Sequence, residues 1–225
     1  MSIKENYEKI RNEIPDHITI VAAAKVRTAE EIAEAIDSGV TDIGENYVRE
    51  AEKIFQDLGE KAKLVKWHMI GHLQTNKINK ALPIFDVIQT VESAEKARAI
   101  NKRAAHINKE IPVYIEVNIG SELSKSGIKP EYKLIEKVIR EISKIEYVRV
   151  EGIMTMGPFA GNPEDVRPYF RKTKEIFDKI KALNLNNVNM NTLSMGMSNS
   201  YKVAVEEGST MIRLGTIIFG ERNYT

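Results

Sequence analysis

The sequence contains no cysteine, few aromatic residues and no excess of either charge. Among its 225 residues, 7% are aromatic, and 33 Lys and Arg residues face 32 Asp and Glu residues, for a formal net charge of +1. The absence of cysteine excludes disulfides, thiolate metal sites and cysteine nucleophiles. The even charge balance argues against a basic groove for nucleic acid and against a basic face for a membrane surface.

Long apolar runs are also missing. No run approaches the roughly 20 residues that span a bilayer, and the charged start "MSIKENYEKIRNEIP" lacks the apolar segment of a signal peptide. We therefore expect a soluble, cytoplasmic protein. The hydrophobic content of 42% is enough for a large core. No linker or low-complexity segment divides the chain, so we expect one domain over residues 1–225.

Short apolar segments alternate with longer amphipathic ones along the whole chain. The apolar segments predict strands at residues 18–24, 40–44, 64–71, 84–91, 111–119, 147–154, 190–195 and 210–220, the last including its exit loop. Eight strand–helix units predict an α/β fold, a single-domain (β/α)8 TIM barrel, with an extra N-terminal helix at residues 3–14 that closes its bottom. The alternative is an open doubly wound sheet, which usually carries a GxGxxG turn that this sequence lacks.

Several helix boundaries follow from local signals. Thr28 and Glu31 have the spacing of a capping box, so a helix is expected to begin there. Another is expected from about Glu45 to Leu58, and one starts between Pro163 and Pro168, because proline is tolerated in a first turn. Ile107 and Leu134 belong by spacing to the apolar stripes of two further helices.

The predicted strands end in polar and glycine-rich segments, which is where barrels carry their chemistry. Ser194 to Ser198 follow the seventh strand, and Arg213 to Thr216 end the eighth. Glycine lets a backbone approach an anion closely, hydroxyl groups donate to it, and barrels often bind phosphate after these two strands. The other explanation is that the glycines only make tight turns between strand and helix.

Lys25 stands at the end of the first predicted strand, across the barrel mouth from those loops. A lysine there is explained either as a solvated strand end or as the amine that forms a Schiff base with a phosphorylated aldehyde, for which pyridoxal 5′-phosphate (PLP) is the candidate. Arg213 faces either the barrel or the outer helices. If it faces inward, its guanidinium would meet the pyridine nitrogen and keep it unprotonated.

Other polar segments carry weaker signals. His68 and His72 are four residues apart, but Gly71 lies between them and metal ligands at this spacing need a helix, so no metal site is predicted. "SKSG" at residues 124–127 and "NKINK" at 76–80 are either solvated surface or binding loops for an anionic ligand.

These motifs together resemble one known family, the pyridoxal phosphate homeostasis proteins, which are related to the N-terminal barrel of alanine racemase. The matching segments, within residues 20–222, are "VAAAK", "IGENYVRE", "KWHMIGHLQTNK", "VNIGSELSKSG", "GIMTM", "LSMGMS" and "EEGSTMIRLGTIIFGER". The resemblance implies a PLP carrier or buffer that contributes to intracellular vitamin B6 and amino-acid balance without established turnover, with PLP-dependent apo-enzymes as candidate partners.

The resemblance also implies roles for individual residues. It makes Lys25 the residue that carries the internal aldimine. It implies that the phosphate is held by Ser194, by the backbone of Met195, Gly196 and Met197, and by the last loop at Gly215 and Thr216. It implies that Arg213 meets the pyridine nitrogen. Asn46 and backbone near Met69 would flank the ring.

Four positions depart from the family pattern: Ala24 replaces Ser or Thr, Leu123 replaces an acid, and Asn199 with Ser200 replaces an acidic pair. An amino-acid racemase is the alternative function. Two-base racemisation needs a group on each face of the substrate carbon, and in two-domain racemases one comes from a second domain that we do not expect here. Without the dimerising surface of that domain, a monomer is expected.

Overall fold

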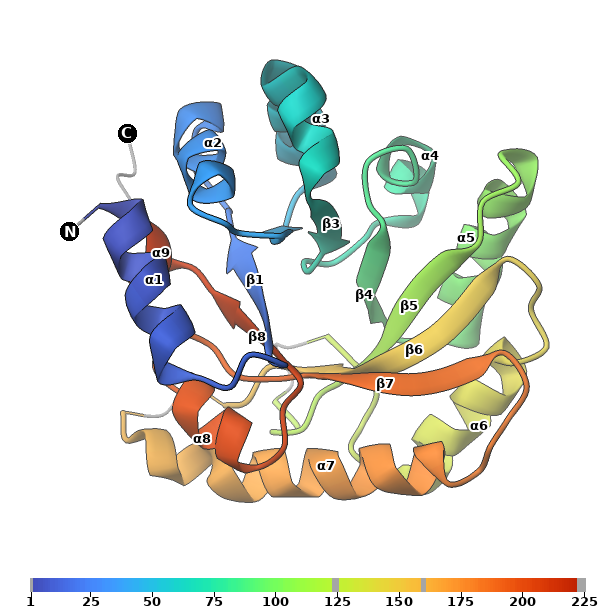
Figure 1. Cartoon of the computed structure of the whole chain (residues 1–225). Coiled ribbons are helices and arrows are strands. Elements are labelled where there is room, and N and C mark those ends of the chain that lie inside the picture. Colours follow the sequence, from blue (N-terminus) through green and yellow to red (C-terminus); the bar gives the residue numbers. More distant parts are fainter. Residues whose placement is uncertain (1, 123–125, 159–160, 222–225) are drawn as a thin grey trace.

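Eight parallel strands close into a barrel in the computed structural model (Figure 1), in the order β1 to β8. The structure describes residues 2–122, 126–158 and 161–221. The strands are β1 Thr19–Ala23, β2 Asp42–Glu45, β3 Lys66–Met69, β4 Val87–Val91, β5 Ile111–Val117, β6 Val148–Thr155, β7 Val188–Ser194 and β8 Met211–Leu214. The predicted (β/α)8 barrel is confirmed.

Helices follow the strands and cover the outside of the barrel (Figure 1). They are α1 Ile3–Glu13, α2 Ala29–Asp37, α3 Val48–Leu58, α4 Ile78–Ala81, α5 Ala94–His106, α6 Tyr132–Ile142, α7 Arg167–Lys181, α8 Tyr201–Glu206 and α9 Thr216–Phe219, with 3-10 turns η1 Gly59–Leu64, η2 Thr75–Lys77 and η3 Pro163–Val166. None of the helices in the described ranges is long and apolar enough to cross a membrane.

The start of α2 shows how local sequence fixes these boundaries. The Thr28 hydroxyl accepts from the Glu31 N–H at 3.3 Å, and the Glu31 carboxylate accepts from the Thr28 N–H at 2.8 Å. This is the predicted capping box, which satisfies two N–H groups that have no acceptor inside the helix. The chain therefore leaves β1 and enters α2 within five residues, and the short connection carries Lys25.

The N-terminal helix exists as predicted but does not close the bottom of the barrel. Helix α1 packs against α9 and α2 (Figure 1). The Tyr7 hydroxyl donates to the Gly39 carbonyl at 3.1 Å, which fixes α1 to the end of α2. Its buried face consists of Ile3, Tyr7 and Ile10, so the apolar stripe is satisfied by neighbouring helices.

Some predicted boundaries and buried faces were wrong. Helix α3 begins at Val48, because Glu45 is the last residue of β2. Part of the predicted exit loop after the eighth strand is the short helix α9. Ile107 is 51% exposed because it follows the end of α5, and Leu134 is 40% exposed because it lies on the outer edge of the α6 stripe.

The apolar residues form two separate cores. The larger core lies between the strands and the outer helices. The smaller one fills the inside of the barrel and consists of Val21, Val87, Tyr114, Met154 and Met211, from five different strands. Because side chains alternate along a strand, residues separated from these by two or four positions also face inward. This register determines which polar residues reach the interior.

Candidate cofactor-binding site

Lys25 lies at the barrel mouth, half-buried in the turn that leaves β1. Its Nζ lies 5.3 Å from the centroid of the Tyr47 ring, within the range of a cation–π contact. Within the described ranges, Lys25 forms no ion pair, so its amine is available to a ligand.

The residue after Lys25 has a strained backbone. Val26 has φ = 62° and is 42% exposed, although β-branched residues rarely adopt the left-handed region. We expect Val26→Gly to raise the free energy of unfolding by about 1 kcal/mol, because glycine carries no steric cost at this φ. Chemical denaturation measures the difference. Val203→Gly in α8 is the opposite control, where glycine in a helix should destabilise the protein.

Arg213 faces inward, two residues after Met211 in β8. Its Nη1 donates to the Ser194 hydroxyl at 2.7 Å and to the Ser194 carbonyl at 3.0 Å, and its Nη2 donates to the Thr155 carbonyl at 2.8 Å. Burial lowers the pKa of Arg213 to about 10, an effect that the nearby Glu116 opposes. The guanidinium is therefore charged at neutral pH and held in one orientation.

A chain of hydrogen bonds links Arg213 to an aspartate across the barrel. The Ser194 hydroxyl donates to Gln89 Oε1 at 2.8 Å, Gln89 Nε2 lies 3.0 Å from His68 Nδ1, and His68 Nε2 lies 2.8 Å from Asp42 Oδ1. These side chains come from β2, β3, β4, β7 and β8 and are all buried. We call this chain, from Arg213 through Ser194, Gln89 and His68 to Asp42, the interior network.

The two ends of the interior network fix the direction of every bond in it. Burial alone would raise the pKa of Asp42, but hydrogen bonds from His68 and Thr41 lower it below its ordinary value. An ionised carboxylate only accepts and a guanidinium only donates. Each group between them must therefore donate toward Asp42, which makes His68 a neutral imidazole with its proton on Nε2.

A further acid faces the interior at the level of Arg213. Glu116 follows the inward-facing Tyr114 by two residues, is 3% exposed, and has a buried Oε2 without a hydrogen-bond partner. Burial raises the pKa of Glu116 to about 7, helped by the negative Glu92 and opposed by Arg213 and Lys96. Glu116, Gln89 and Asp42 were not among the site residues predicted from the sequence. The available signal was a polar residue at an inward position of an apolar strand.

The loops after β7 and β8 lie side by side, as the predicted phosphate site requires. The Arg213 N–H donates to the Gly196 carbonyl at 3.0 Å. Gly196 has φ = 98°, and a Cβ there would lie 2.6 Å from the Ala204 Cβ, so only glycine fits this turn. Gly215 caps α9, and Thr216 is its exposed first residue.

Three of the predicted phosphate ligands already have partners in this arrangement. The Ser194 hydroxyl belongs to the interior network, and the Met197 N–H donates to the Ser200 hydroxyl at 3.2 Å. Met195 is fully buried and its N–H donates to the Met211 carbonyl at 3.0 Å. Their predicted contacts with a phosphate therefore stay predictions. Gly196 is also buried, so the more accessible part of this set is the half-buried Gly215 and the exposed Thr216.

The remaining predicted residues lie on the β2 and β3 side of the mouth. Asn46 is half-buried after β2, and a Cβ on Gly71 would lie 2.4 Å from its carbonyl oxygen, so the two loops touch directly. The Met69 side chain points into the outer core, which leaves only its backbone toward the mouth. His72 is exposed. Leu123 and residues 124–125 of "SKSG" lie outside the described residues.

A model of the alanine racemase N-terminal domain matches residues 1–223 of the chain. The pyridoxal phosphate homeostasis protein of Aquifex aeolicus is 40% identical over 205 residues, which cover 91% of this chain and 87% of that protein. The Escherichia coli K12 protein of the same name is 36% identical over 94% of this chain and 88% of its own. This chain belongs to the pyridoxal phosphate homeostasis protein family.

Solved structures agree with the sequence matches. PipY of Synechococcus elongatus, solved with PLP bound, is 27% identical, with a TM-score of 0.86, and the match covers 97% of this chain and 100% of that one. An alanine racemase of Clostridium difficile shares the fold at 19% identity and a TM-score of 0.81. That match covers 98% of this chain but only 56% of the racemase chain.

Proposed function

We propose that this protein binds PLP through Lys25 and acts as a cytoplasmic, monomeric carrier or buffer of the cofactor, which PLP-dependent apo-enzymes receive. The observation that carries the proposal is the Lys25 amine, which faces the barrel mouth without an ion-pair partner among the described residues. The names of the relatives and the PLP found in PipY support it.

The residues around Lys25 fit this cofactor. When PLP is bound, its aldehyde supplies a carbon that forms an imine with an amine. Lys25 presents that amine, and the turns at Gly196 and Gly215 follow β7 and β8, of which β8 pairs with the strand that leads to Lys25, so a phosphate at these turns would lie on the same side of the mouth. The fixed positive charge of Arg213 suits an unprotonated pyridine nitrogen, because a protonated one would place two positive charges together.

The interior network explains why the site favours binding over turnover. Carbanion chemistry on PLP is strongest when the pyridine nitrogen is protonated, and Arg213 opposes that proton. Arg213 cannot easily turn away, since two backbone carbonyls and the Ser194 hydroxyl hold its guanidinium. We therefore assign Ser194 to the positioning of Arg213 and leave the phosphate to the glycine-containing turns.

The proposed link to Lys25 is tested by absorbance and mass spectrometry. The wild-type protein with added PLP should become yellow, and after borohydride reduction a peptide containing Lys25 should carry the cofactor. Lys25→Ala should lose that adduct entirely. Lys66→Ala is the matched control, because Lys66 begins β3 at the opposite end of the barrel and is exposed. A wild-type protein that takes up no PLP, or a K25A protein with an unchanged chromophore, would contradict the proposal.

One observation favours the racemase alternative, namely the Glu116 carboxyl inside the barrel. A pKa raised to about 7 is suited to proton transfer near neutral pH. The PLP-loaded protein is to be incubated with L-alanine and with D-alanine while optical rotation is followed. We expect no change beyond that of free PLP. A steady loss of optical purity that disappears in Glu116→Gln would replace the carrier function by racemisation.

A further inference from the structure

A cationic cleft opens beside Tyr47, on the rim of the barrel between the loops that follow β2 and β3. It has a volume of about 360 Å³, and the polar residues among those that line it are Asn46, Tyr47, Arg49, His72, Gln74 and Lys77. We call it the rim cleft. Its size is that of a small-molecule site. The loops on its two sides are in direct contact at Gly71 and Asn46, so its walls are fixed relative to each other.

The charges in the rim cleft are of one sign. Arg49 and Lys77 contribute two positive charges, and none of the described acidic residues lines the cleft. Within the described ranges, neither residue forms an ion pair, whereas Lys80 on the next turn pairs with Glu52 at 2.9 Å. Glu52, the partner of Lys80, lies on the same helix as Arg49 and does not line the cleft. Two cations left without a counter-charge match the charge of a phosphate monoester, about −1.5 to −2 at pH 7.

The donors in the rim cleft also match a phosphate group. A guanidinium binds two phosphate oxygens at once, and an ammonium adds a compact charge with three donors. The side chains of Asn46, Gln74 and His72 supply further hydrogen-bonding groups. A lone carboxylate would leave one of the two cations unmatched, so the phosphate monoester is the better fit.

An aromatic surface separates the rim cleft from Lys25. The Tyr47 ring lines the cleft, is 49% exposed, and has the Lys25 amine 5.3 Å from its centroid. An exposed ring provides a stacking surface for another ring. We propose that the rim cleft binds, without a covalent bond, a phosphate monoester that carries an aromatic ring. Free PLP and other phosphorylated aromatic molecules share this chemistry.

The binding site is located by NMR on the full chain. The ¹⁵N-labelled Lys25→Ala protein is titrated with phenyl phosphate, which has no aldehyde and therefore cannot react with a lysine. We expect amide shifts at residues 46–49 and 72–77. Shifts confined to residues near Gly196 and Gly215 would overturn the proposal. Because this protein lacks Lys25, the result does not depend on the covalent binding proposed above, which is tested by the adduct on the wild-type chain.

Variants then test the two cations. Arg49→Ala and Lys77→Ala should each weaken the binding that shifts residues 46–49 and 72–77 by about tenfold. Lys80→Ala removes a neighbouring charge that is paired and does not line the cleft, and should change affinity less than twofold. Equal losses of affinity in Lys77→Ala and Lys80→Ala would mean that the ligand responds only to general surface charge, and would contradict the proposed site.

The ligand class is tested with three probes. Phenyl phosphate and pyridoxine 5′-phosphate should bind the rim cleft more tightly than glycerol phosphate, which lacks a ring. If glycerol phosphate binds equally well, the aromatic part of the proposal is wrong. Tighter binding of pyridoxine 5′-phosphate than of phenyl phosphate would identify the B6 vitamers as the source of the ligand, and the reverse order would indicate another phosphorylated aromatic molecule.

Discussion

Replacing Gln89 by leucine is expected to lower the free energy of unfolding by about 3 kcal/mol. Leucine has a similar volume, but it removes the bonds of 2.8 Å to the Ser194 hydroxyl and 3.0 Å to His68 Nδ1. The change leaves the buried Ser194 O–H without its acceptor and the buried His68 Nδ1 without its donor, and each such unsatisfied group costs about 1–3 kcal/mol. Urea denaturation of wild type and variant measures the loss.

The control for this prediction is Thr90→Val in the same strand. The Thr90 hydroxyl donates at 2.8 Å to the Gly71 carbonyl and is not part of the interior network. Its removal should cost about 1 kcal/mol. If Gln89→Leu is no more costly than Thr90→Val, the interior network does not stabilise the protein as described.

Gln89→Glu tests the direction of the interior network. The new carboxylate accepts from Ser194 as before, but it cannot donate to His68 Nδ1. The contact to His68 is therefore lost while the contact to Ser194 is kept, so the variant should be less stable than wild type in urea denaturation at pH 7. A variant as stable as wild type would mean that Gln89 does not donate to His68 Nδ1.

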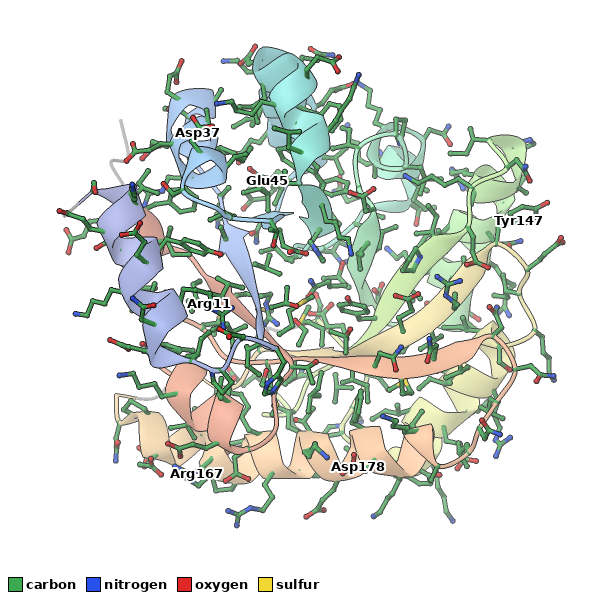
Figure 2. All side chains as sticks on the ribbon, in the orientation of Figure 1. Arg11, Asp37, Glu45, Tyr147, Arg167 and Asp178 are labelled. Carbon is green, nitrogen blue, oxygen red and sulfur yellow. The ribbon has the colours of Figure 1, made fainter. Side chains whose placement is uncertain are left out.

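The second large effect concerns Glu45, which is expected to make the protein less stable as pH rises. Glu45 is fully buried at the end of β2, between α2 and α3 (Figure 2), and no side chain of the described residues pairs with its carboxylate, which has only a weak contact with the backbone N–H of Asn46. Burial, followed by the negative Glu50, raises the pKa of Glu45 to about 8. The folded protein therefore holds this proton up to a higher pH than the unfolded chain does.

The sign of the effect follows from that difference. A carboxyl group with an ordinary value near 4.5 in the unfolded chain and about 8 in the folded protein contributes most stability below pH 4.5. The contribution is lost as pH rises from 4.5 to 8, a total on the order of 5 kcal/mol. Glu45→Gln removes the titrating group, so the difference in unfolding free energy between Glu45→Gln and wild type should rise over this range.

Urea denaturation of both proteins at pH 5, 6, 7, 8 and 9 checks this prediction. The comparison isolates Glu45, because every other titrating group is common to the two proteins. Glu50→Gln is the matched variant, because it removes the neighbouring negative charge that raises the pKa of Glu45. This variant should therefore have lost less stability at pH 7 than the wild-type protein. Parallel pH profiles for wild type and Glu45→Gln would show that Glu45 ionises normally.

The barrel was predictable because its signals are local. Alternating apolar and amphipathic segments, the capping box at Thr28 and the short connections specify strand–helix units one at a time, and eight such units close into this fold. The placement of α1 was not predictable in the same way. Its apolar stripe requires a partner surface, and which one it contacts depends on distant segments such as α9.

The candidate site was only partly predictable, for a related reason. Lys25 and the turns at Gly196 and Gly215 stand out because they end strands, and the ends of parallel strands meet at one rim. The interior network joins residues 171 positions apart in the chain, from Asp42 to Arg213. Each member alone is an isolated polar residue in an apolar strand, and only the closed barrel shows that they form one set of bonds.

The apolar layer of Val21, Val87, Tyr114, Met154 and Met211 determines how a small molecule can enter and leave the barrel. These side chains fill the interior of the barrel on the N-terminal side of Lys25, as is usual for this fold. A small molecule bound at Lys25 would therefore enter and leave through the barrel mouth alone. Any enzyme that takes its cofactor directly from this protein must approach that same entrance, next to Tyr47 and the rim cleft.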